Sequence, residues 1–121
     1  MEWKIAVERE LAAGRAAQAR GNQSMARVCA RRAAGWAAAA WLDARGQALQ
    51  TPSVLEQLRQ LAAVGSLPAR GGEIVAHLLT YKTKHDMTDI NEESHFPLDV
   101  DLITEAEELI ELLFPQQKKA A

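Results

Sequence analysis

The sequence predicts an all-α protein, an up-down bundle of four or five helices. Apolar residues recur every three or four positions through most of the chain, which is the period of an amphipathic helix. No segment alternates apolar and polar residues with the period of two that a half-buried β-strand requires. Alanine supplies 23 of the 121 residues, and although each alanine contributes little buried area, it lets helices approach closely. Glycines and prolines stand between the periodic segments, where helices are expected to end.

The first predicted helix is long and covers about residues 2–20. Its core face carries apolar or small residues at spacings of three and four: Trp3, Val7, Leu11 and Gly14. Gly21 and Asn22 follow, and a glycine is the usual residue just beyond a helix C-terminus. We therefore expect a tight turn into a second helix.

The second predicted helix covers residues 23–45 and ends at Gly46. It carries two neighbouring apolar faces. One has the larger residues Met25, Val28, Cys29 and Trp36, and the other has Ala26, Ala30, Ala33, Ala37 and Trp41. A helix with so wide an apolar arc normally lies at the centre of a bundle and contacts several neighbours. The tryptophans, including Trp3, are predicted to be core anchors rather than stacking platforms for bases.

Two shorter helices are predicted next. Thr51-Pro52-Ser53 begins the first of them, because proline suits a first turn and Ser53 with Glu56 has capping-box spacing. Its core positions are Val54, Leu55, Leu58 and Leu61. After the turn "VGSLPARGG", the following helix begins near Pro68 or Gly72. Its inward residues are Ile74, Val75, Leu78 and Tyr81.

The end of the chain contains a polar segment and then a last helix. Residues 82–95 lack a clear period, which predicts a long loop or a frayed helix extension. Pro97 precedes the final helix, whose cap is Asp99 or Asp101, and Pro115 closes it. Its core positions are Leu102, Ala106, Leu109 and Leu113, and its first turns carry Glu105 and Glu107, where the helix dipole favours acids. We expect one domain over residues 1–115 and a flexible tail over 116–121.

Charge is distributed unevenly along a chain whose net charge is −2. Residues 1–70 contain ten basic side chains and five acidic ones, whereas residues 71–121 contain four lysines and eleven acids. A basic half is a possible phosphate-binding surface. The alternative is that solvent-facing arginines of the early helices face an acidic last helix, and this interpretation is favoured.

The chain has one cysteine, Cys29, so it forms no internal disulfide. This fits a reducing compartment, and no apolar stretch reaches the ~20 residues that cross a bilayer. We therefore expect a cytoplasmic protein without a membrane segment. Neighbouring arginines could activate the thiol, but its place on the apolar side of a central helix predicts a small, inert core residue.

The helix order resembles that of the HEPN family, small helical domains first described as nucleotide-binding in higher eukaryotes and prokaryotes. Two long N-terminal helices, the first beginning with a tryptophan, frame "ARVCARRAAGWAAAAWLDARG", and a short leucine-rich helix and a histidine-bearing helix follow. The resemblance covers roughly residues 2–114. It implies a homodimer of four- or five-helix bundles. It also implies a common partner, a minimal nucleotidyltransferase with which HEPN proteins form toxin–antitoxin pairs.

The same resemblance implies a candidate RNase site at Arg70 and His77. Many HEPN domains carry an arginine, four to six intervening residues and a histidine, and here "GGEIVA" separates the two. Active members usually place a polar residue directly after the arginine, whereas this chain has Gly71. The chemistry would need His77 to take the proton of an RNA 2′-hydroxyl while Arg70 holds the phosphate. Such a site needs neither a metal nor a cofactor.

The spacing of Arg70 and His77 leaves the geometry of this site open. Seven positions are almost two helical turns, so both residues share a face but lie ~10 Å apart. A single chain would bring them to one phosphate if Gly71-Gly72 unwound the helix, and a two-fold dimer could place both chains around a shared cleft. Alternatively, His77 is an ordinary interface histidine and Arg70 a turn residue paired with an acid.

Other sites are less favoured. Glu73 and His77 have i, i+4 spacing, and His85, Asp86 and His95 follow, but the sequence has no cysteine pair and no His-Glu-x-x-His motif for zinc. "RGGE" lacks the lysine and spacing of a phosphate-binding loop. We therefore expect a dimeric HEPN-like module that associates with a partner protein, RNA or a nucleotide. The alternatives are an RNase using Arg70 and His77, and a non-catalytic adaptor that docks a partner through residues 82–95.

Overall fold

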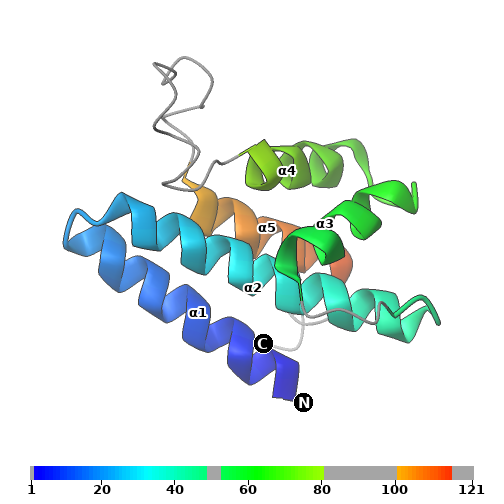
Figure 1. Ribbon diagram of the computed structural model, residues 1–121, viewed down its shortest axis with the longest axis horizontal. Helices are drawn as coiled ribbons and strands as arrows, with labels where there is room; N and C mark the ends of the chain where they lie inside the picture. The colour runs from blue at the N-terminus through cyan, green and yellow to red at the C-terminus, as the bar shows by residue number, and fades with distance from the viewer. Residues whose placement is uncertain (1, 49–52, 81–100, 116–121) are drawn as a thin grey trace.

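The chain is an all-α bundle in the computed structural model, which describes residues 2–48, 53–80 and 101–115 (Figure 1). Within those ranges it contains helices and turns and no strand. The five helices are α1 (Glu2–Ala19), α2 (Gln23–Ala44), α3 (Val54–Ala63), α4 (Ala69–Thr80) and α5 (Leu102–Leu113). Each lies within a few residues of its predicted position, so the predicted all-α class is confirmed.

The helix ends follow from local chemistry. Gly21, Gly46 and Gly65 have φ values of 78°, 73° and 73°, a left-handed conformation that other residues rarely adopt. The Asn22 side chain accepts a hydrogen bond from the Met25 amide, and Ser53 accepts one from the Glu56 amide. These bonds satisfy backbone donors that the first helical turn leaves without intrahelical partners. The predicted cap at Ser53 is confirmed.

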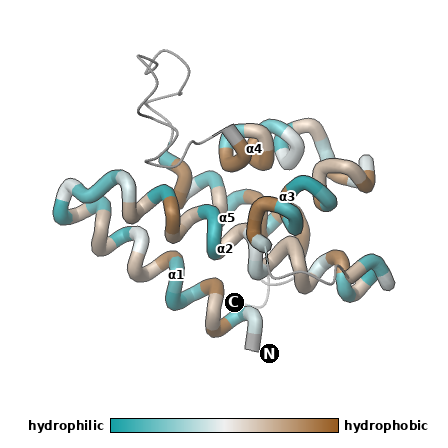
Figure 2. The backbone as a smooth tube through the Cα atoms, viewed as in Figure 1, coloured by the Kyte–Doolittle hydropathy of each residue, from teal (hydrophilic) through white to brown (hydrophobic). Residues whose placement is uncertain are grey.

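Helix α2 lies at the centre and packs against α1, α3 and α5 (Figure 1). Its buried face is made mostly of alanines, which let the neighbouring helices approach closely. The tube of Figure 2 shows hydrophobic and hydrophilic positions succeeding one another along each helix, as amphipathic helices require. The largest fully buried side chains come from all the helices after α1: Leu42, Leu58, Leu61, Ile74, Leu78, Ile103 and Leu109.

Two glycines mark the closest helix contacts. A Cβ atom at Gly14 of α1 would overlap Ile103 Cδ1 of α5 and lie 3.1 Å from Cys29 Cβ of α2. A Cβ atom at Gly35 would lie 2.9 Å from Val54 Cγ1. The absence of a side chain at these positions lets α1 and α3 reach α2.

The prediction for the large-residue face of α2 is wrong in part. Cys29 is buried as expected, but Met25, Val28 and Trp36 are 41%, 36% and 47% exposed. The alanine face occupies the core instead, because small residues allow the closer approach of helices. Trp41 is buried, and Trp3 stacks on Phe114 with ring centroids 4.7 Å apart, so only Trp36 of the three tryptophans fails as a core anchor.

The predicted inward residues of α4 and α5 are confirmed where the structure describes them. Ile74, Val75, Leu78, Leu109 and Leu113 are buried. Tyr81, residues 82–95 and 97, and the tail 116–121 lie outside the described ranges, so the predictions made for them stay predictions. No helix in the described part of the chain combines the length and the apolar character needed to cross a membrane.

Candidate functional site

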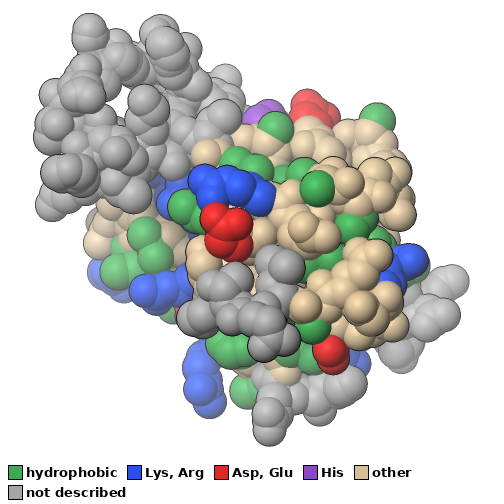
Figure 3. Space-filling view, turned by 45° about the vertical axis from the view of Figure 1, so that its right-hand side comes forward, with side chains coloured by type: hydrophobic (Ala, Val, Ile, Leu, Met, Phe, Trp, Pro, Cys, Tyr) green, Lys and Arg blue, Asp and Glu red, His purple; other side chains and the backbone are tan. Residues whose placement is uncertain are grey.

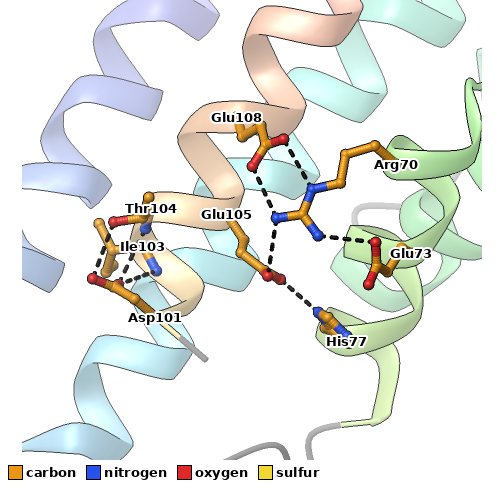
Figure 4. A network of polar contacts seen from close by, with 8 residues as sticks. All are labelled: Arg70, Glu73, His77, Asp101, Ile103, Thr104, Glu105 and Glu108. Carbon is orange, nitrogen blue, oxygen red and sulfur yellow. Dashed lines mark hydrogen bonds and ion pairs between the residues drawn. The ribbon is translucent and has the colours of Figure 1, made fainter. Parts of the chain in front are cut away.

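Arg70 and His77 lie on the face of α4 that packs against α5 (Figure 4). Helix α4 begins directly after Pro68, whose carbonyl oxygen accepts a hydrogen bond from the Gly72 amide at 3.1 Å. The buried residues Ile74, Val75 and Leu78 fix the helix against the core. This anchoring directs the long side chain of Arg70 and the ring of His77 toward the first turns of α5.

The Arg70 guanidinium donates to three carboxylates. Its Nε and Nη2 atoms bind the two oxygens of Glu108 at 2.9 Å each, a bidentate fork. Nη1 binds Glu73 Oε1 at 3.0 Å, and Nη2 also reaches Glu105 Oε2 at 3.3 Å. Every guanidinium nitrogen of Arg70 therefore faces an acid of α4 or α5 (Figure 4).

Glu105 joins the arginine to the histidine. Its Oε1 atom lies 2.6 Å from His77 Nδ1, while its Oε2 atom contacts Arg70. The Glu105 side chain is 11% exposed and that of His77 is 23% exposed, so the contact is largely shielded from water. A carboxylate on Nδ1 fixes the ring orientation of a histidine. Glu105 thus links His77 to Arg70, and Arg70 also binds Glu73 and Glu108. We refer to these five residues as the Arg70 network.

The ion pairs shift the proton equilibria in the directions that attraction requires. The hydrogen bonds to Glu108 and then to Glu73 raise the pKa of Arg70 above its ordinary range. The hydrogen bond from Arg70 lowers the pKa of Glu108. Both shifts favour the charged forms, so the fork between Arg70 and Glu108 is an ion pair at neutral pH.

The geometry differs from the first arrangement considered for the sequence motif, in which Gly71-Gly72 unwinds the helix. The arrangement that places two chains around a shared cleft stays a prediction. Gly71 and Gly72 are helical, and neither has a positive φ, so the helix does not unwind between Arg70 and His77. The two side chains nevertheless meet on Glu105 within a single chain, because the extended arginine reaches along the face of α4 toward α5. The predicted pairing of Arg70 with an acid is confirmed, but the expectation that Arg70 is a turn residue is wrong, because it lies in the first turn of α4.

The charge of this network opposes phosphate binding. Three carboxylates, from Glu73, Glu105 and Glu108, surround the one guanidinium. A phosphate that approached Arg70 would have to displace at least one of these carboxylates and then stand close to the others. At short range, like charges destabilise such an arrangement.

Three acids of the network carried a weak signal in the sequence. Glu105 and Glu108 are three residues apart and so share a face of α5, and Glu73 is three residues after Arg70. Sequence reasoning placed Glu105 through the helix dipole and Glu73 through a metal hypothesis, and it missed Glu108. The sequence does contain Glu105 and Glu108 as an i, i+3 pair of acids. It does not show that this pair faces Arg70, because that contact depends on how α4 packs against α5.

Arginines of the basic half partly face acids of α5, as predicted. Arg15 pairs with Glu107, and this hydrogen bond raises the pKa of Arg15. Arg31 instead donates from Nε to the Leu78 carbonyl oxygen at 3.1 Å, near the C-terminal end of α4. Burial lowers the pKa of Arg31 and of Arg27, and in Arg31 the charge of Arg27 adds to that effect.

Among the described residues, the structure does not assemble the metal site or the reactive thiol that were considered from the sequence. In the described ranges, no three side chains of His, Cys, Asp or Glu are grouped so that they could hold a metal ion, and His85, Asp86 and His95 lie outside those ranges. Cys29 is 2% exposed, and burial, followed by the charge of Glu10, raises the pKa of its thiol. The prediction of a buried cysteine is confirmed.

Two open hollows mark the surface away from the Arg70 network. One, of about 480 Å³, lies along α2 between α1 and α3 and is lined by Glu10, Arg32, Gly35, Trp36, Ala39, Val54 and Gln57. The other, of about 380 Å³, lies between α1 and α5 and is lined by apolar residues such as Trp3 and Ile110, with Glu8, Glu107 and Glu111 among the rest. Only the first contains a large exposed aromatic side chain, that of Trp36.

Comparisons of the chain with protein-family models, with curated proteins and with solved structures found no match.

Proposed function

We propose that this chain is a HEPN-like helical bundle that acts as a dimeric partner-binding module. In this proposal Arg70 and His77 hold α4 on α5 and do not cleave RNA in the conformation described. The resemblance implies a minimal nucleotidyltransferase as the partner, in a toxin–antitoxin pair. The order of two long helices, a short helix, a histidine-bearing helix and a final helix supports the family assignment.

The observation that carries the proposal is the engagement of Arg70. Its bidentate pair with Glu108, at 2.9 Å for each bond, and its contacts with Glu73 and Glu105 engage every nitrogen of the guanidinium with a carboxylate. An arginine kept for substrate is normally left with donors directed at the substrate position. Here the donors bind the protein itself, which is the arrangement of a contact between helices.

A partner-binding role is supported by the surface of α2. Met25, Val28 and Trp36 are large apolar residues that remain exposed, although the same helix buries small alanines. Exposed large apolar residues that gather on one helix commonly mark a protein contact. On the face shown in Figure 3, hydrophobic side chains reach the surface between basic and acidic ones.

A second candidate is a metal-independent RNase, because Glu105 brings His77 and Arg70 together. His77 would take the proton of a 2′-hydroxyl, and the 2′-oxygen would form a bond to phosphorus as the bond to the 5′-oxygen breaks. The leaving oxygen would take a proton from water, which gives a 2′,3′-cyclic phosphate and a 5′-hydroxyl. The contact of 2.6 Å between Glu105 and His77 Nδ1 favours this candidate, since a carboxylate orients a catalytic histidine in the same way. Arg70 would first have to leave Glu108.

One assay separates the two candidates. The purified chain is incubated with labelled single-stranded RNA in the presence of a chelator, beside His77→Ala, Arg70→Ala and the control Arg59→Ala. Arg59 is an exposed arginine of α3, and it pairs with Glu56, which is not part of the network. We expect no cleavage by any of the four proteins. Cleavage by the wild-type chain and by Arg59→Ala that is lost in both other variants would establish the RNase and refute our first proposal.

A further inference from the structure

The exposed side of α2 has a symmetric pattern. One side of α2 carries Met25, Val28, Arg32, Trp36 and Ala39, of which the first four are exposed and Ala39 is partly buried. Their spacings are three, four, four and three, so the pattern reads the same in both directions from Arg32. The pattern spans fourteen steps, or about 21 Å of helix. We refer to these five residues as the α2 strip.

From this pattern we propose that the α2 strip binds the α2 strip of a second copy of the chain, with the two helices antiparallel and the two-fold axis at Arg32. The proposal rests on the dimeric module proposed above and names its interface. A two-fold interface must be self-complementary, because each surface meets its own copy. A strip with the same spacing in both directions meets this requirement on an antiparallel copy.

Residue sizes also match in this register. With Arg32 at the axis, Trp36 lies opposite Val28 of the second copy, and Met25 lies opposite its Ala39. Each contact thus pairs a large side chain with a smaller one. Helix packing favours such pairs, because the large side chain fits into the space beside the smaller one. The hollow of about 480 Å³ beside Ala39 and Gly35 is open in the single chain. Met25 of the second copy would enter it, and the flexible thioether side chain suits an irregular gap.

Charges at the axis are complementary as well. Arg32 lies 3.9 Å from Glu10 of α1, a long ion pair within one chain in which the Arg32 side chain is exposed and the Glu10 side chain is partly buried. The two-fold operation places two arginines and two glutamates around the axis, so each Arg32 can bind a glutamate of either copy. The acids offset the repulsion between the two arginines. The α2 strip therefore has apolar contacts at both ends and a balanced polar centre.

Three proteins test the interface by sedimentation equilibrium at micromolar concentrations: the wild type, Trp36→Glu and Ile5→Glu. Ile5 is the matched control, since it is 58% exposed and lies on α1, outside the α2 strip. We expect a wild-type dimer, an unchanged dimer for Ile5→Glu, and a dissociation constant raised at least ~30-fold for Trp36→Glu, as for an aromatic hot spot. Circular dichroism reports whether Trp36→Glu keeps its helix content.

A second measurement does not depend on the folding of Trp36→Glu. In a Cys29→Ala background, which removes the one native thiol, Arg32→Cys should form a covalent dimer on mild oxidation, because the axis brings the two copies of position 32 together. Arg9→Cys, an exposed position of α1, should remain uncrosslinked. A wild-type dimer that tolerates Trp36→Glu, or that fails to crosslink through position 32, would overturn this interface but leave the dimeric module. A wild-type monomer would overturn both.

Discussion

Asp101 illustrates how one side chain can fix the start of a helix. Its carboxylate accepts hydrogen bonds from the Ile103 and Thr104 amides at 3.1 Å and from Gln18 Nε2 of α1 at 2.9 Å. It therefore caps α5 and ties that end of the helix to α1. Burial opposes ionisation of Asp101, but the hydrogen bond from Gln18 and those from Thr104 and Ile103 outweigh it and lower its pKa.

Replacing Asp101 with alanine should lower the free energy of unfolding by about 1 kcal/mol, the usual cost of losing an N-cap. Because the folded-state pKa lies below the ordinary value of 3.8, the contribution of ionised Asp101 is present above that pH and is lost as the pH falls through the folded-state pKa. Urea unfolding of both proteins at pH 7 and at acidic pH measures this. An equal difference in stability at both pH values would contradict the role of the ionised carboxylate.

The accessibility of the Cys29 thiol reports on how closely the core is packed. The thiol is buried and its pKa is raised, so both access and thiolate formation are suppressed. We expect labelling by a water-soluble aromatic disulfide to be at least ~100-fold slower in the native chain than in the unfolded chain. Comparable rates in the two states would mean that α1 does not cover α2 at this position.

At the scale of helices, the closeness of α1 to α2 and α5 depends on Gly14. Alanine at this position would meet Ile103 and Cys29, and overpacking in a core costs about 1–3 kcal/mol. The gain of ~1 kcal/mol in helix propensity offsets part of that cost, so Gly14→Ala should be net destabilising by roughly 1 kcal/mol.

Gly72→Ala is the matched control for Gly14→Ala, because Gly72 lies in a helix and a Cβ atom there would have no atom within 4 Å. Only the propensity term applies, and the variant should be more stable than the wild type by roughly 0.5–1 kcal/mol. Thermal unfolding followed by circular dichroism compares the two. Stabilisation by both alanines would show that α1 packs more loosely than described.

Helix boundaries were the best predicted feature of these elements. Gly21, Gly46 and Ser53 act through their own backbone or through a neighbour three residues away, so the sequence contains the whole interaction. The outward orientation of Trp36 was not predictable in the same way. Helical spacing shows that Trp36 and Cys29 lie near one another on α2, but which of them meets α1 depends on Gly14, a residue distant in sequence.

The candidate site was also predictable only in part, because some of its contacts depend on how the helices pack in the whole molecule. The sequence identified Arg70, His77 and an acidic last helix, and it suggested that arginines face those acids. It could not show that Glu105 binds both Arg70 and His77, since that depends on how α4 docks on α5. The acids that join the two residues also change the interpretation of the motif, from a phosphate site toward a contact between helices.

The core of the molecule buries many alanines, whereas its surface exposes several larger apolar residues. Large apolar residues left outside the core of a single chain, 47% exposed for Trp36, are accounted for if a second chain covers them. We therefore propose that the chain functions as a pair. Sedimentation equilibrium of the unmodified protein at micromolar concentration tests it most directly. We expect a mass twice the chain mass of 13.3 kDa, and a mass equal to that of one chain would contradict the proposed dimer.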